Sequence, residues 1–154
     1  AASDVYKRQS EHDPDRLSVY GQLVTNAAVA ASRGGAGADS AREYLSQAHA
    51  VAARIGEERA RGSHAQPYGP MYAATQAMSI AVALGDTAGA LRLMDTVRLD
   101  EAVPLATRAR YGLDVALTQV ECRRWDAAAD TLQNVCTMAP GWVRHQMLPG
   151  VIIS

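Results

Sequence analysis

The sequence predicts an all-α fold in which helical hairpins stack into an irregular array, an α-solenoid of about six to seven helices. Alanine is abundant, Phe is absent, and β-branched and aromatic residues never cluster into the alternating runs that form strands. Apolar residues recur at helical spacing along most of the chain. One pattern, an Asp followed by an alanine, a large apolar residue and a small residue, occurs three times. Together these features indicate repeated pairs of helices.

Pro14 is placed to open the first predicted helix, because proline is favoured at the first position of a helix. Its apolar stripe comprises Leu17, Tyr20, either Leu23 or Val24, Ala27 and Ala31. The glycine-rich residues 34–37 end this helix. Asp39 is expected to cap the second helix, which is expected to close at Gly56.

Residues 57–69 form the longest irregular segment, and Pro70 is placed to open the next helix. Loops of this length often carry binding residues, and the plainer alternative is a solvated connection. The hairpin that follows joins residues 70–85 to residues 86–98. Its expected interlocking faces are Met78, Ile80, Ala81 and Leu84 on one helix, and Ala90, Leu91, Met94 and Val97 on the other.

The segment from Leu105 to Pro140 is expected to form a complete helical hairpin with a turn and N-cap at Trp125–Asp126. Its apolar faces are Leu113, Ala116, Leu117 and Val120, followed by Ala128, Leu132 and Val135. After Pro140 another helix begins, and Pro149–Gly150 is expected to break it.

The pattern shared by the second helices resembles that of a tetratricopeptide repeat. Its members are Ala41, Leu45 and Ala48, then Ala90, Met94 and Val97, then Ala128, Leu132 and Val135. Asp39, Asp86 and Asp126 precede the three copies as expected N-caps. The copies are 49 and 38 residues apart, against about 34 in the standard repeat. Gly112 and Gln119 stand where the repeat usually has Trp and Tyr, so the array is irregular.

The expected organisation is one helical-repeat domain over residues 14–154. Residues 1–10 match nothing that follows, and residues 1–13 are expected to be a disordered or non-native lead-in. At the other end, the apolar residues 151–153 have no visible partner in the sequence, whereas repeat arrays close with a polar capping helix. We therefore expect the chain to be truncated at its C-terminus.

Charge and hydropathy narrow the range of partners. The formal net charge is −1, so there is no basic field to hold a polyanion, and we expect no direct nucleic-acid binding. No apolar run approaches the roughly 18 residues of a membrane span, and no signal peptide is visible, so we expect a cytoplasmic protein without membrane contact. Cys122 and Cys136 fall on the two helices of the last hairpin and are expected to be reduced thiols.

The residues with reactive side chains form no catalytic or metal-binding pattern. The four histidines lack metal-ligand spacing, and the chain contains neither HExxH nor CxxC. Nucleophile motifs of the G-x-S-x-G and S-x-x-K types are also missing. The glycine-rich residues 34–37 follow a helix and lack the Lys-Ser/Thr ending of a phosphate loop. We expect no enzyme activity, no metal and no cofactor.

Several phrases in order resemble a larger family: DRLSVYGQLVTNAAVAASRGGAGADSAREYLSQAHAVAARIG, QPYGPMY, AVALGDTAGALRLMDTV and ALTQVECRRWDAAADTLQNVCTMAPGWVRHQML. Over residues 15–148 they are similar to the C-terminal helical-repeat region of high-GC bacterial transcriptional regulators that carry an N-terminal Cro/repressor-type helix-turn-helix domain. The resemblance implies a sensory and oligomerising region that takes a peptide or small-molecule effector on its inner surface, with homodimerisation as a further expectation. The DNA-reading helix of such regulators has no counterpart in this sequence. A free-standing protein-protein adaptor of the tetratricopeptide type is the alternative.

A ligand on a stack of hairpins meets the first helix of each hairpin. Projected onto this chain, the candidate contacts are Asn26, Tyr72, Thr75, Ser79 and Arg110 on those helices, with Gln66 and Tyr68 in the long loop. The tyrosines offer stacking area with a polar tip, and Arg110 could pair with a peptide carboxylate. The alternative for each of them is an ordinary exposed helix residue without a role in binding.

Overall fold

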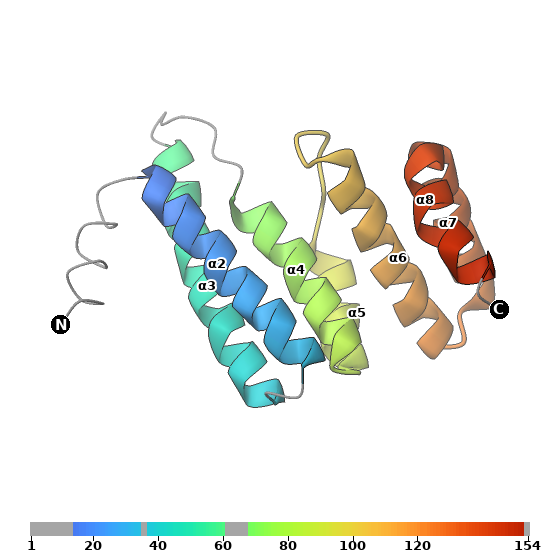
Figure 1. The fold of residues 1–154 in the computed structure, drawn as a ribbon, viewed down its shortest axis with the longest axis horizontal. Helices are drawn as coiled ribbons and strands as arrows, with labels where there is room; N and C mark the ends of the chain where they lie inside the picture. The colour runs from blue at the N-terminus through green and yellow to red at the C-terminus, as the bar shows by residue number, and fades with distance from the viewer. Residues whose placement is uncertain (1–13, 35–36, 61–67, 153–154) are drawn as a thin grey trace. The chain divides into compact units, whose positions relative to one another are not determined.

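The computed structural model describes residues 14–34, 37–60 and 68–152. This part of the chain contains seven α-helices and no strand, so the all-α prediction is confirmed there. The helices are α2 (Pro14–Arg33), α3 (Ala38–Ala60), α4 (Pro70–Ala83), α5 (Thr87–Thr96), α6 (Leu105–Glu121), α7 (Trp125–Met138) and α8 (Pro140–Ile152) (Figure 1). The expected lead-in at residues 1–13 lies outside the described residues, as do residues 61–67 of the predicted irregular segment. Pro70 opens α4 as predicted.

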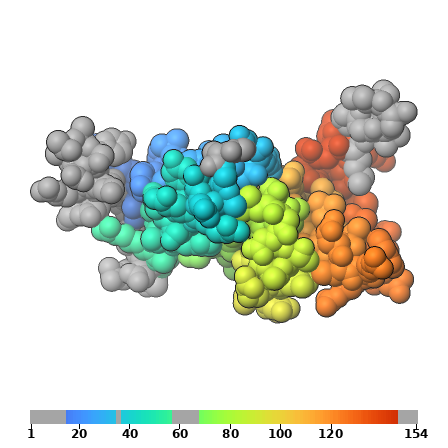
Figure 2. All heavy atoms as spheres, turned by 90° about the horizontal axis from the view of Figure 1, so that it is seen from below, coloured from blue at the N-terminus to red at the C-terminus, as the bar shows by residue number. Residues whose placement is uncertain are grey.

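The chain divides into two compact units, Ala1–Ile80 and Ala81–Ser154, and the boundary falls inside α4. In unit 1, α2 and α3 lie side by side and pack closely on one another (Figure 1). Their side chains are in direct contact in the space-filling view, where α2 is blue and α3 is cyan (Figure 2). The buried apolar residues of these helices are mostly small: Leu17, Val24, Ala28 and Ala31 on α2, and Ala41, Ala48, Val51, Ala52 and Ile55 on α3. Small side chains let two helix backbones approach closely, which accounts for the tight pair.

The structure shows which of two adjacent residues, Leu23 or Val24, belongs to the buried apolar stripe of α2. Val24 is buried at 7% exposure, whereas Leu23 is 62% exposed. Val24 lies seven residues after Leu17 and four before Ala28, so the three share one face of the helix.

Two predicted boundaries of α3 were wrong. Asp39 is not its N-cap, because α3 begins one residue earlier, at Ala38. Gly37 precedes it with a φ of 97°, and its carbonyl accepts the Ala41 N–H at 3.3 Å. Gly56 does not end α3, which continues to Ala60. A Cβ atom at Gly56 would lie 3.0 Å from Cγ of Pro70, so this glycine allows a close approach instead of marking a helix end.

Unit 2 contains two helix-ending turns with the same hydrogen bonds. After α4, Gly85 N–H donates to the Val82 carbonyl (3.1 Å) and Asp86 N–H to the Ala81 carbonyl (2.8 Å). After α6, Arg123 N–H donates to the Val120 carbonyl (2.9 Å) and Arg124 N–H to the Gln119 carbonyl (2.8 Å). Gly85 and Arg123 both have a left-handed backbone, with φ values of 68° and 58°. These are the paired bonds of a Schellman motif, repeated at an interval of 38 residues.

The two turns differ in how they start the next helix. Asp86 is the N-cap of α5, as predicted, and its Oδ1 accepts the Gly89 N–H at 2.9 Å. Asp126 is not the N-cap of α7, because Arg124 takes that position without a side-chain hydrogen bond. Because Arg123 has a left-handed backbone, the chain turns before it reaches Asp126, and α7 already starts at Trp125. Asp126 therefore falls in the first turn of α7. There the carboxylate still interacts favourably with the positive end of the helix dipole.

The core between α6 and α7 explains both departures from the repeat pattern. Gly112 lies directly against Val135, and a Cβ atom at this position would overlap the valine Cγ2. Gln119 lies across from Thr131, whose Oγ1 is 2.8 Å from the glutamine Oε1. Val135 joins Ala109 and Ala139 in a buried cluster that also contacts Leu113, Met138, Trp142 and Val143.

The predicted apolar face of α6 was correct for part of its length. Ala116 is buried at 3%, whereas Leu117 and Val120 are 52% and 37% exposed. α8 begins at Pro140 and extends to Ile152, so the expected break at Pro149–Gly150 is not observed. A proline removes one backbone hydrogen bond from a helix and kinks it, and near the end of a helix this loss does not stop the chain from continuing.

Candidate functional site

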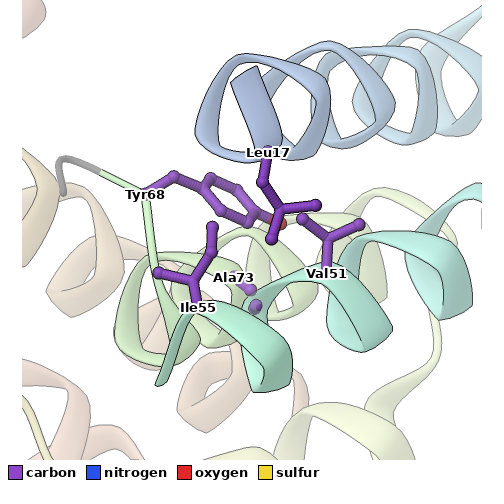
Figure 3. Packing of buried hydrophobic residues seen from close by; sticks show 6 residues of the cluster. Leu17, Val51, Ile55, Tyr68 and Ala73 are labelled. Carbon is purple, nitrogen blue, oxygen red and sulfur yellow. The ribbon is translucent and has the colours of Figure 1, made fainter. Parts of the chain in front are cut away.

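Tyr68, a predicted ligand contact, is fully buried in unit 1. Its ring enters between α2 and α3, close to Leu17 on one side and to Val51 and Ile55 on the other (Figure 3). A Cβ atom at Gly21 would come within 2.5 Å of the ring carbon Cε1, so the glycine on α2 provides the space that the ring occupies. Tyr68 is therefore part of the core.

The hydroxyl group of Tyr68 joins the two helices. It donates to the Ala48 carbonyl of α3 at 3.1 Å and shares a hydrogen bond with Thr25 Oγ1 of α2 at 2.9 Å. Burial raises the pKa of Tyr68 above its ordinary value of 10.0; the Thr25 hydrogen bond opposes this and the neighbouring Tyr72 adds to it. The phenol is held in its neutral form, with each of its hydrogen bonds made inside unit 1.

The three predicted contacts on α4 are less accessible than a ligand-facing row would be. Tyr72 is half-buried and packs edge-on against Tyr68, with ring centroids 5.6 Å apart. Thr75 is 3% exposed and donates its hydroxyl hydrogen to the Tyr72 carbonyl at 2.7 Å. Ser79 is 8% exposed. Tyr72 is only partly buried, whereas Thr75 is buried and its hydroxyl is used within its own helix.

Asn26 and Arg110, the remaining described candidates, are exposed. Asn26 lies on α2 in unit 1, and Arg110 lies on α6 in unit 2. Gln66 lies outside the described residues.

Arg110 already has a carboxylate partner. Its Nε is 3.6 Å from Oδ1 of Asp114, one turn later on α6. The Asp114 side chain is 3% exposed and that of Arg110 is 50% exposed, so a buried carboxylate faces a half-exposed cation. The sequence analysis did not single out Asp114 as the partner of Arg110. An Asp between Leu113 and Val115, in an otherwise apolar helix segment, was a visible signal of a buried carboxylate. A peptide carboxylate at Arg110 would have to share the guanidinium with Asp114.

Unit 2 also contains a pocket that sequence reasoning did not predict. Its volume is about 230 Å³, and it lies where the α4–α5 turn meets the C-terminal end of α6. Its lining residues are Ala81, Val82, Gly85, Asp86, Thr87, Ala90, Leu117, Thr118 and Glu121. No single segment of the sequence could have indicated it, because the lining comes from two stretches about 30 residues apart.

In the described residues, no group of three or more His, Cys, Asp or Glu side chains is arranged to hold a metal ion. Cys122 is half-buried, Cys136 is exposed, and both are free thiols. None of the described helices combines the length and the apolar character needed to cross a membrane. Partial burial lowers the pKa of His49 from its ordinary value of 6.5.

Comparison with known proteins provides no relative from which a function could be transferred. No protein-family model, no curated protein and no solved structure matches the chain.

Proposed function

We propose that the chain is a non-catalytic helical-repeat domain, an irregular tetratricopeptide-like array that binds a peptide, protein or small-molecule effector. The observation that carries the proposal is the repeated turn of unit 2, with the same two hydrogen bonds at Gly85–Asp86 and at Arg123–Arg124. Each turn is followed by a helix whose first buried alanine is in the same place, Ala90 in α5 and Ala128 in α7. Repeated helix pairs stack into extended binding surfaces, and such arrays characteristically bind partners.

Exposed apolar side chains on the helices support a role in binding. Val19 and Leu23 of α2 are 59% and 62% exposed and lie one helical turn apart. Leu117 and Val120 of α6 are 52% and 37% exposed with similar spacing. Adjacent exposed apolar residues on one helix face are typical of interaction surfaces, whereas scattered single ones are not. Each unit thus has its own apolar surface for a partner.

The accessible predicted residues complete the proposed contact set. Asn26 lies one turn beyond Leu23 on α2, Tyr72 is only partly buried, and Arg110 is exposed on α6. We leave out Tyr68, Thr75 and Ser79, because they are buried within the protein.

Within this proposal the favoured role is the sensory and oligomerising region of a bacterial transcriptional regulator, as the resemblance of residues 15–148 implies. A free-standing adaptor is the second candidate. The two are separated by translating the gene upstream of Asp15 in frame. A helix-turn-helix module joined there is the expected result, and a start codon close to Asp15 with no such module would replace the regulator by the adaptor.

Binding itself is tested by selecting peptides from a random displayed library against the full chain. We expect a recurring motif, with affinity measured by fluorescence anisotropy of the labelled peptide. Leu23→Ser or Leu117→Ser should weaken binding about tenfold or more, because a buried large apolar side chain contributes about 1.5–3 kcal/mol. Tyr44→Ser is the matched control, because Tyr44 is also an exposed apolar residue, on α3. Failure to select any motif, or equal affinity in all three variants, would refute the binding role.

A further inference from the structure

The pocket of unit 2 combines apolar walls with acidic side chains. Its aliphatic lining comes from Val82 of α4 and Leu117 of α6, together with Ala81 and Ala90. Its two ionisable lining residues are Asp86 and Glu121, both acidic. Arg123 and Arg124 follow Glu121 in the chain, but neither is among the lining residues. The pocket therefore matches a ligand that has an apolar stem and a positively charged head.

The backbone around the pocket adds to this preference. Ala81 and Val82 belong to the last turn of α4, and Thr118 and Glu121 to the last turn of α6. The carbonyl end of a helix carries partial negative charge and favours a cation. Only the start of α5 opposes this, and there the Asp86 carboxylate already caps the Gly89 N–H. Two helix C-termini and two carboxylates thus surround one cavity.

The size of the pocket points to a side chain and not to a whole effector. Its volume of about 230 Å³ is below the roughly 300–1,000 Å³ that drug-sized ligands usually occupy. An arginine has a three-carbon stem that can lie along Val82 and Leu117, and a planar guanidinium that can bind carboxylates with several N–H groups. Leu117 is 52% exposed, so an arginine stem would cover apolar surface that is now in contact with water.

We propose that this pocket holds an arginine side chain of the partner peptide or protein, with the guanidinium between Asp86 and Glu121. The assignment rests on the proposed binding function and specifies the chemistry of its partner. It differs from the contact expected at Arg110, which would take an acidic group. A partner that uses both sites would carry a basic residue for the pocket and a carboxylate for Arg110.

The test uses the ¹⁵N-labelled full chain titrated with N-acetyl-arginine amide and followed by two-dimensional NMR. Because the probe is one side chain, a dissociation constant on the order of 1–10 mM is expected. The amide signals of Gly85, Thr87 and Leu117 should shift. N-acetyl-citrulline amide, which has nearly the same shape without the charge, should bind at least about fivefold more weakly. Equal binding of both probes, or no shift at the pocket amides, would overturn the assignment.

A pair of variants locates the charge. Glu121→Gln keeps the shape of an exposed side chain and should weaken N-acetyl-arginine amide about three- to tenfold. Asp130→Asn, at another exposed acidic residue, on α7 outside the pocket, should leave the affinity unchanged. Unchanged affinity in Glu121→Gln would contradict the proposal, and the citrulline comparison in the unmodified chain keeps it testable if that variant folds poorly.

Failure here can be told apart from failure of the proposed function. If a selected peptide binds the full chain but N-acetyl-arginine amide causes no shift, the pocket assignment falls and the binding role stands. If the probe shifts the pocket amides but no peptide motif is selected, the pocket binds an arginine side chain and the proposed peptide-binding function is refuted.

Discussion

Tyr68 shows how one residue of an irregular segment can organise unit 1. It inserts its ring against Gly21 and uses its hydroxyl to connect Thr25 of α2 with the Ala48 carbonyl of α3. Sequence reasoning placed it in a loop as a ligand contact, because a tyrosine beside prolines shows no periodicity that would reveal burial. The signal that could have been noticed is Gly21, an unexplained glycine inside a helix.

Tyr68→Phe should lower the free energy of unfolding by about 1–3 kcal/mol, because it removes a hydroxyl that satisfies buried partners in two helices. Urea unfolding monitored by circular dichroism measures this. Tyr44→Phe, at a 40% exposed position on α3, should change stability little and serves as the control. A Tyr68→Phe variant as stable as the unmodified chain would contradict the bridging role.

The raised pKa of Tyr68 gives the same residue a pH dependence. A group whose pKa is higher in the folded state stabilises the fold fully below its unfolded pKa and loses that contribution as the pH rises through the folded pKa. Burial raises the pKa of Tyr68 above 10.0, so its contribution should persist up to about pH 10 and be lost above it. In the Tyr68→Phe variant, the loss of stability that comes from ionisation of Tyr68 at alkaline pH should disappear. If the free energy of unfolding of the variant depends on alkaline pH as that of the unmodified chain does, this prediction is contradicted.

Among the helical elements, the local capping rules succeeded at one left-handed glycine, Gly85, and failed at another, Gly37, where Asp39 was wrongly predicted as the N-cap of α3. The left-handed Gly85 allowed Asp86 to be read correctly as the cap of α5. Arg123 takes the same conformation without being a glycine, so the sequence misplaced the cap of α7 by two residues. Non-glycine residues seldom adopt this conformation, and nothing local predicts the few that do.

Arg123→Gly should raise the free energy of unfolding by about 0.5–1 kcal/mol, because glycine adopts a positive φ without a steric cost. Gly85→Ala, at the equivalent turn with a φ of 68°, should lower it by about 1 kcal/mol. Thermal unfolding of both variants beside the unmodified chain tests the pair. A destabilised Arg123→Gly together with an unaffected Gly85→Ala would show that the two turns are not equivalent.

The α6–α7 contact depends on the fit of Gly112 to Val135. Gly112→Ala should destabilise the chain by about 1–3 kcal/mol, because the added methyl group overlaps the valine in a packed core. The double variant Gly112→Ala/Val135→Ala should lose less stability than the two single changes added together, with a coupling of about 0.5–3 kcal/mol. Gly141→Ala is the control, since nothing lies within 4 Å of a Cβ atom there. Strict additivity would mean that the two residues do not share the contact.

At the scale of the whole molecule, composition predicted the fold class better than it predicted the site. Helical periodicity and alanine content were sufficient for an all-helical chain, and the described residues contain seven helices. The exposure of individual apolar side chains was harder to predict, because apolar periodicity identifies one face of a helix without showing what packs against that face. Leu117 and Val120 were predicted to lie on the apolar face of α6 and are exposed, and the pocket beside Leu117 depends on tertiary contacts that a linear pattern does not contain.

The proposed function is that exposed faces of the helices receive a partner. Hydrogen–deuterium exchange of the full chain, with and without a saturating selected peptide, tests this. We predict slower exchange on peptide binding in residues 19–26 of α2, or in residues 81–90 together with 117–121, where the exposed apolar side chains and the pocket lie. Binding that leaves exchange unchanged in every described helix would contradict the claim.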